Sequence, residues 1–247
     1  MSITGRQALV VGGSTGIGRA IAEAWSQAGL EVTVLSRNPP SNQGKIRWMS
    51  VDLTDHQAVQ AALAEAATGP LQAVCYAAVY YGDRRSLFSE TALTEWRQQL
   101  EVNLNGLWLT LQATLPSLRQ SLPGLFLNVS SEVVYNGGPG RSGYAATKAA
   151  CASLIDSLSQ EEDPAKVRFI SVLPAGMVDS AGIRRRRPSD FDYSGYMRPE
   201  SFDRVAVELI TNQNQFINGA SLMVQANGHW QPVQETKPAS QSDRSRL

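Results

Sequence analysis

Residues 7–25, QALVVGGSTGIGRAIAEAW, run from an apolar segment through a glycine-rich loop into a helical segment. The apolar segment predicts a buried first strand that ends at Gly12. Glycines permit a tight turn and let the backbone approach a pyrophosphate, and the free N–H groups at the start of the helix attract that anion. A glycine loop set between a strand and a helix therefore favours nucleotide binding over a plain tight turn.

Apolar runs that predict strands recur along the chain and alternate with helical segments. Strands are expected at residues 6–12, 31–37, 45–53, 71–78, 124–130, 167–174 and 216–228, and helices after the glycine loop and at 56–67, 93–118, 144–162 and 199–211. With no early hairpin, this alternation predicts an α/β fold: a doubly wound parallel sheet of about seven strands with helices on both faces, a Rossmann fold. Ligands of such sheets bind at the carboxyl ends of the strands.

A chain of 247 residues has a normal length for a single α/β domain. We expect one dinucleotide-binding and catalytic domain over residues 1–230 and a polar tail over 231–247, which its composition predicts to be disordered. Cys75 and Cys151 lie in apolar contexts, which favours buried, reduced thiols and a cytoplasmic location.

The charge balance argues against several classes of partner. Lys plus Arg and Asp plus Glu both number 22, so the chain has no overall field that would attract nucleic acid or a membrane. No apolar run reaches the length of a membrane span, and the first strand begins too early for a signal peptide. The only histidines, His56 and His229, have no neighbouring ligand cluster, so no metal site is expected.

The end of the second predicted strand indicates which dinucleotide is bound. An acidic residue at this position would bind the ribose 2′-hydroxyl of NAD, but the chain has Ser36 followed by Arg37. No carboxylate is present to repel a 2′-phosphate, and a guanidinium can bind one. The pair favours NADP(H) over NAD, and over an exposed arginine without a ligand.

A second stretch, residues 131–148, carries groups suited to proton transfer. Tyr144 and Lys148 are four residues apart, so they share one face of a helix. An ammonium beside a phenol favours the phenolate and is expected to lower the pKa of Tyr144, which makes it a candidate general acid or base. Ser131, at a strand end, is a candidate hydrogen-bond partner for a substrate oxygen.

Two further features each have two interpretations. Asn103 and Gly106 interrupt the helical pattern at 93–118, either as a kink or because Asn103 holds a water or a backbone group beneath the lysine. The four arginines at 184–187 lie in an insertion that extends to residue 198. They indicate either a surface for an anionic substrate or carrier, or a solvated flexible lid, which is favoured because charge runs are usually solvated.

From about Gln7 to Gly228 the chain resembles the short-chain dehydrogenase/reductase family, in its short single-domain branch. Gly12-x-x-x-Gly16-x-Gly18 is similar to the cofactor loop of the family. Asn103, Ser131, Tyr144 and Lys148 are similar to its catalytic tetrad, with its thirteen-residue interval from serine to tyrosine. The usual Asn-Asn-Ala-Gly after the fourth strand is replaced here by Cys75-Tyr76-Ala77-Ala78.

The resemblance implies reduction of a ketone or aldehyde by hydride transfer from NADPH, with Tyr144 as general acid. Ser131 would hold the carbonyl oxygen, Lys148 would lower the pKa of the phenol and bind the nicotinamide ribose, and Asn103 would support a water that feeds protons to Lys148. Together, loop spacing and resemblance give these cofactor-binding candidates: Gly12, Ser14, Thr15, Gly16, Ile17, Gly18, Ser36, Arg37, Asp52, Leu53, Ala77, Ala78, Asn103, Tyr144, Lys148, Pro174, Gly176, Val178 and Ser180.

Alternatives from other classes stay open. A non-catalytic NADP-binding regulator could keep the fold, although the tetrad argues against it. An epimerase or dehydratase of the longer related branch is disfavoured by the glycine spacing and by the chain length. The expected partners are a small carbonyl substrate and, by resemblance only, a second copy of the chain in a homodimer or homotetramer formed through the helices at 93–118 and 144–162.

Overall fold

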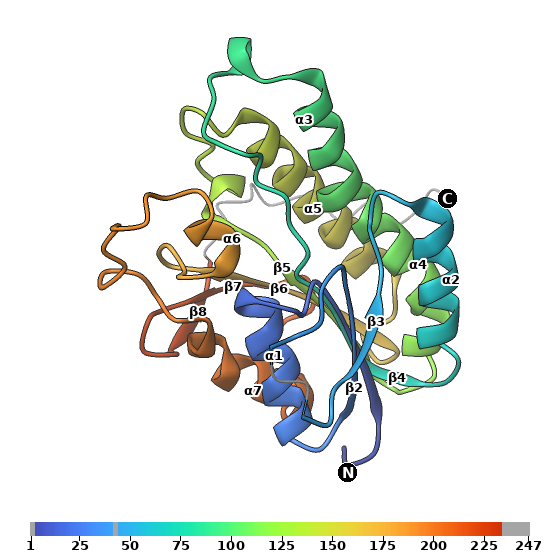
Figure 1. Cartoon of the computed structure of the whole chain (residues 1–247). Helices are drawn as coiled ribbons and strands as arrows, with labels where there is room; N and C mark the ends of the chain where they lie inside the picture. Colours follow the sequence, from blue (N-terminus) through green and yellow to red (C-terminus); the bar gives the residue numbers. More distant parts are fainter. Residues whose placement is uncertain (1–2, 42–43, 234–247) are drawn as a thin grey trace, which may run out of the picture.

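A single sheet of eight strands forms the centre of this computed structural model, which describes residues 3–41 and 44–233 (Figure 1). The strand order is β3-β2-β1-β4-β5-β6-β7-β8. Strands β1 to β7 run parallel, and β8 is antiparallel to β7. The strands are β1 Gln7–Val11, β2 Glu31–Ser36, β3 Arg47–Ser50, β4 Leu71–Tyr76, β5 Gly124–Val129, β6 Val167–Pro174, β7 Ser221–Val224 and β8 Trp230–Pro232.

Helices cover both faces of the sheet, and each face has its own apolar core. The core on one face includes residues of α1 and α7, and the core on the other includes residues of α2, α4 and α5 (Figure 1). No helix in the described part of the chain is long and apolar enough to cross a membrane. The helices are α1 Gly16–Gln27, α2 His56–Ala66, α3 Leu93–Gln99, α4 Gly106–Leu118, α5 Ser142–Glu161, α6 Ala181–Arg184 and α7 Asp203–Thr211, with short 3₁₀ turns at Phe88–Glu90, Glu132–Val134, Pro199–Phe202 and Gln213–Gln215.

The chain reverses its direction of travel across the sheet between β1 and β4. The strands β1, β2 and β3 are added outward on one side, and β4 then returns to pair with β1 on the other side. The loops that leave β1 and β4 at their carboxyl ends therefore diverge to opposite faces and leave a crevice where α/β sheets bind ligands. The predicted Rossmann-type fold is confirmed.

One detail of the sheet corrects the prediction. An eighth strand, Trp230–Pro232, pairs with β7, so the predicted boundary at residue 230 is too early. A three-residue strand carries too short a pattern for its periodicity to be recognised, and only its partner in the sheet reveals it. The remainder of the predicted tail, residues 234–247, lies outside the described residues.

The helix predicted at 93–118 is divided into three segments. Between α3 and α4, the segment Leu100–Asn105 is a π-helix, so Asn103 and Gly106 mark a real break in the α-helical pattern. Tyr76, at the end of β4, donates its hydroxyl to the Val102 carbonyl of this segment. A Cβ at Gly106 would collide with that hydroxyl, so a residue without a side chain is required there. Tyr76, which stands where the family usually has Asn, therefore packs against this irregular part of the helix.

Candidate active site

A cleft of about 950 Å³ runs along the carboxyl ends of the parallel strands. It is lined by the loop after β1, by Ala77 and Ala78 after β4, by Ser131 after β5 and by Pro174 at the end of β6. Every predicted cofactor-binding or catalytic residue lines this cleft except Asn103. The sequence therefore predicted one site, and the fold brings its parts together.

The glycine loop packs tightly on the end of β4. Gly12 has a φ of +86°, a conformation that residues with side chains rarely adopt, and a Cβ there would collide with the backbone of Ala78. A Cβ at Gly18 would meet the Gly12 carbonyl oxygen. Glycine at both positions, with small residues at Ala77 and Ala78, keeps the backbone accessible at the start of α1, as a bound pyrophosphate requires.

The other end of the cleft presents a cation. The Ser36 hydroxyl donates to the Asn38 carbonyl (2.8 Å), so its hydrogen is already used. Arg37 is exposed, lines the cleft and has no ion pair with any described residue. Asp52 accepts hydrogen bonds from Thr54, chiefly from its backbone N–H, and these lower the pKa of the carboxyl, with a smaller contribution from Arg37. This end fits a ribose phosphate, with Arg37 as its one cationic partner among these residues.

The three groups predicted for proton transfer converge on the cleft. Tyr144 and Lys148 lie in the first two turns of α5, and Ser131 follows β5. All three are buried, with exposed fractions of 8%, 4% and 6%. The Lys148 ammonium donates to the Val129 carbonyl (2.7 Å), which fixes it at the floor of the cleft.

The direction of the Tyr144 pKa shift corrects the sequence-based prediction. Burial raises the pKa of this phenol well above its usual value, and Tyr81 and Glu132 raise it further. A hydrogen bond with Ser131 acts in the opposite direction. Burial also lowers the pKa of Lys148. The expectation that Lys148 lowers the pKa of the phenol is wrong for this structure, because burial outweighs a cation that bonds to the backbone instead.

Asn103 lies beneath the site, and its side chain forms hydrogen bonds with the backbone. Its side chain accepts from the Tyr80 N–H (2.7 Å) and donates to the Tyr80 carbonyl and to the Thr147 hydroxyl, both at 3.0 Å. The Cys151 thiol donates to its carbonyl (3.1 Å). The expectation that Asn103 holds a backbone group is met by Tyr80: Asn103 joins the π-helix to α5 and to the loop after β4.

Sequence reasoning missed a carboxylate at the site. Glu132 accepts from the Ser131 hydroxyl (2.7 Å) and forms an ion pair with Arg141 (2.8 Å). All three residues line the cleft. The position of Glu132 directly after the candidate serine was the available signal, but a neighbour in sequence at a strand end does not reveal where its carboxylate points.

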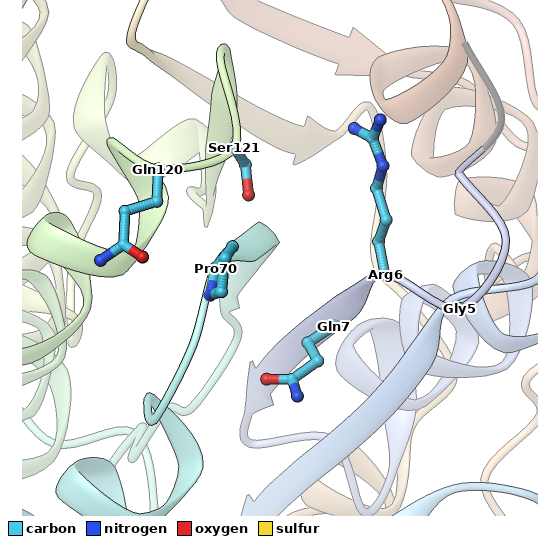
Figure 2. A pocket seen from close by; sticks show the side chains of 6 residues that line it. All are labelled: Gly5, Arg6, Gln7, Pro70, Gln120 and Ser121. Carbon is cyan, nitrogen blue, oxygen red and sulfur yellow. The ribbon is translucent and has the colours of Figure 1, made fainter.

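A second pocket, shown in Figure 2, lies far from these groups. Its volume is about 380 Å³, and it is lined by Gly5, Arg6, Gln7, Pro70, Gln120 and Ser121, which precede or begin β1 and β4 or follow α4. It therefore lies at the amino ends of the strands. Its lining residues include no Asp, Glu, His, Cys, Lys or Tyr that could act as a general acid or base. Among the described residues, no cluster of His, Cys, Asp and Glu could hold a metal. The long cleft is the candidate active site.

Comparison with known proteins identifies the family. Residues 6–190 match the family described as short chain dehydrogenase, which is most of the chain. The chain belongs to the short-chain dehydrogenase family. As a member, it is an oxidoreductase of a family that uses NAD or NADP.

Several short-chain dehydrogenases resemble it over most of their length. An uncharacterized oxidoreductase of Staphylococcus aureus strain MW2 is 28% identical over 198 residues, which cover 76% of this chain and 84% of that one. A 3-oxoacyl-[acyl-carrier-protein] reductase of Chlamydia muridarum is 25% identical, and the alignment covers 90% of this chain and 96% of that one. Among solved structures, a 3-oxoacyl (acyl-carrier-protein) reductase of Agrobacterium tumefaciens C58 with NADP bound is 26% identical, with a TM-score of 0.79 and coverage of 92% and 95%.

Proposed function

We propose that this short-chain dehydrogenase reduces a ketone or aldehyde with NADPH, as a ketoreductase, with Tyr144 as the general acid. The observation that carries the proposal is the convergence of Ser131, Tyr144 and Lys148, from β5 and α5, on the cleft that the glycine loop borders. A phenol, a hydroxyl and an ammonium around one space can hold and protonate a carbonyl oxygen.

Each group has a task in this reaction. When bound, NADPH supplies the hydride for the carbonyl carbon. Ser131 orients the carbonyl oxygen, and Tyr144 gives it a proton. The raised pKa of Tyr144 keeps the phenol protonated at neutral pH, which is the form that reduction requires. Lys148, fixed by the Val129 carbonyl, is placed to bind the nicotinamide ribose.

The preference for NADPH rests on Arg37. Its guanidinium faces the cleft without an ion pair among the described residues, and it is suited to a 2′-phosphate. Wild-type protein is expected to prefer NADPH to NADH, and Arg37→Ala is expected to remove most of that preference. Roughly 1.5–3 kcal/mol for a charge-assisted hydrogen bond corresponds to about a tenfold to hundredfold change in NADPH affinity.

Exposed and buried side chains bear on the assembly and the location of the protein. We propose a homodimer or homotetramer formed through α4 and α5, because Trp108 of α4 is 56% exposed, which is unusual for such a large apolar side chain. We propose a cytoplasmic location because both cysteines, Cys75 and Cys151, are free and buried.

The test is NADPH consumption across ketones, aldehydes, quinones and β-keto esters. Tyr144→Phe is expected to lower kcat by about 100-fold or more, since general acid catalysis contributes roughly that much, with NADPH affinity retained. Tyr135→Phe is the matched control, because Tyr135 is exposed and does not line the cleft. Loss of turnover in both variants, or in neither, would contradict the assignment. A wild type that binds NADPH but reduces nothing would favour the non-catalytic regulator.

A further inference from the structure

We propose that the substrate carries a carboxylate or phosphate group beside its carbonyl, and that the guanidinium of Arg186 binds this anion. The inference deepens the proposed carbonyl reduction and rests on it. The groups that support it are Tyr81, whose ring packs against the candidate acid Tyr144, and Arg186, whose guanidinium lies over the Tyr81 ring.

Tyr81 forms one wall of the cleft next to Tyr144. The two ring centroids are 5.0 Å apart, with an interplanar angle of 56°. The Tyr81 carbonyl accepts from the side chain of Gln99 (3.2 Å), and the preceding residue, Tyr80, is held through both of its backbone groups by Asn103. The buried Gln99 and Asn103 thus fix the loop that carries this ring, so Tyr81 is a built wall of the site.

Arg186 lies over the ring of Tyr81. Its guanidinium carbon is 5.5 Å from the Tyr81 ring centroid, and the residue lines the cleft. Arg186 is half-buried, its Nε is buried without a hydrogen-bond partner, and it has no ion pair with any described residue. The Tyr81 ring therefore lies next to both the phenol that would protonate the substrate and a cation without an ion pair among the described residues.

Charged side chains of both signs lie near Arg186: the cations Arg187 and Arg85 and the carboxylate of Glu95. Burial is the main cause that lowers the pKa of its guanidinium, and Arg187 and Arg85 add to this, while Tyr81 and Glu95 oppose it. Bringing a cation into a partly desolvated position near two other cations costs free energy. An anion bound there would be attracted by all three, and a guanidinium offers carboxylate or phosphate two parallel hydrogen bonds.

The neighbouring arginines have different surroundings. Arg184 is exposed, forms a bidentate ion pair with Asp179 (both contacts 2.6 Å) and does not line the cleft. Arg187 lies over the Phe191 ring (5.3 Å) and donates to the Tyr196 hydroxyl (3.3 Å). Arg187 is also half-buried and lines the cleft, but Arg186 is the arginine of the run whose guanidinium lies over Tyr81, the ring beside Tyr144.

The closeness of the two groups indicates a small substrate. An anion at Arg186 and a carbonyl at Tyr144 can belong to one molecule with a short spacer, because both side chains lie next to the Tyr81 ring and line the same cleft. The phosphates of the cofactor have other proposed partners, the glycine loop and Arg37. Arg186 is therefore assigned to the substrate.

The experiment compares matched probes that differ only in the anion. For carboxylate, 4-carboxybenzaldehyde is compared with its methyl ester, and for phosphate, dihydroxyacetone phosphate is compared with dihydroxyacetone. Wild-type protein is expected to favour at least one anionic member by about tenfold or more in kcat/KM, mainly through KM. The pair with the larger ratio identifies the anion.

Variants then assign the effect to Arg186. Arg186→Gln is expected to abolish the preference, measured as the ratio of kcat/KM between the two members of each pair, and Arg186→Lys is expected to restore part of it. Arg184→Gln, in the same run but outside the cleft, is the control and is expected to keep the full preference. Equal kcat/KM for both members of both pairs in the wild type would overturn the inference, as would an unchanged preference in Arg186→Gln.

A binding measurement separates this inference from the proposed activity. Calorimetry with 4-carbamoylbenzoate and its methyl ester, in the presence of NADP, needs no turnover. Tighter binding of the anion in the wild type, lost in Arg186→Gln, would support the anion site even in a protein that reduces none of the probes. Equal binding of both molecules by a protein that does reduce neutral carbonyls would reject the anion site and leave the reductase.

Discussion

Tyr144 is a buried phenol, and the side chains around it change its pKa. Burial, the adjacent Tyr81 ring and the Glu132 carboxylate raise its pKa, and the hydrogen bond with Ser131 lowers it. A phenol with a raised pKa stays protonated at neutral pH, so it can act there as a general acid but only rarely as a general base. The protonated phenol suits the proposed carbonyl reduction, and the reverse oxidation of an alcohol, which needs the phenolate, is expected to become faster as the pH rises.

Glu132 offers a way to test this balance. Because its negative charge raises the pKa of Tyr144, Glu132→Gln is expected to lower that pKa and to move the rise of alcohol oxidation to lower pH. The pH profile of kcat/KM with NADP and an alcohol product measures the shift. Glu162→Gln, which alters an ion pair with Arg119 at the far end of α5, is expected to leave the profile in place. A rise at unchanged or higher pH in Glu132→Gln would refute this account.

The π-helix at Leu100–Asn105 is an element shaped by what it holds. Asn103 satisfies the backbone N–H and C=O of Tyr80, and its own exposed fraction is 1%. A regular helix would place its side chains at a different angle, and π-turns of this kind often occur at functional sites. The irregular turn therefore connects the loop that carries Tyr80 and Tyr81 with α5, which carries Tyr144.

Asn103→Ala is expected to lower the free energy of unfolding by about 2–4 kcal/mol, because it leaves two backbone groups buried without partners. Asn105→Ala is the control from the same turn: its side chain donates only to Glu101 (3.0 Å) at the surface, and about 1 kcal/mol or less is expected. Urea unfolding of both variants measures the difference. Equal losses would show that Asn103 does not hold the loop.

The whole molecule depends on the sheet order and on the surface that its helices present. The reversal between β1 and β4 gathers the glycine loop, Ser131 and Tyr144 at one edge from segments far apart in sequence. The helix α4, which covers one face of the sheet, exposes the side chain of Trp108. An exposed tryptophan on a covering helix is typical of a contact surface.

Trp108→Glu is expected to convert the proposed oligomer into smaller species, because a charge buried in an apolar contact is strongly unfavourable. Light scattering coupled to gel filtration measures the mass. Ile217→Glu, an exposed apolar residue outside α4 and α5, is expected to keep the wild-type mass. A monomeric wild type, or an unchanged mass in Trp108→Glu, would exclude assembly through α4.

Local patterns determined the fold and most of the candidate site. The strand, glycine loop and helix at residues 7–25 and the spacing of Tyr144 and Lys148 depend on the chain's own periodicity, so the sequence alone predicted them. The short strand β8 and the precise extent of β3, expected at 45–53 and observed at Arg47–Ser50, escaped because the sheet partner, not the local pattern, defines such strands.

Only the tertiary structure decided how the site groups behave. The direction of the Tyr144 pKa shift, the use of the Asn103 side chain by Tyr80 and the place of Arg186 over Tyr81 all depend on segments far apart in the chain. Burial and charge act through space, so a residue's neighbours in sequence do not fix its ionisation or its partners. The sequence by itself named the groups and their order, and packing determined how buried each of them is and which side chains and backbone groups surround it.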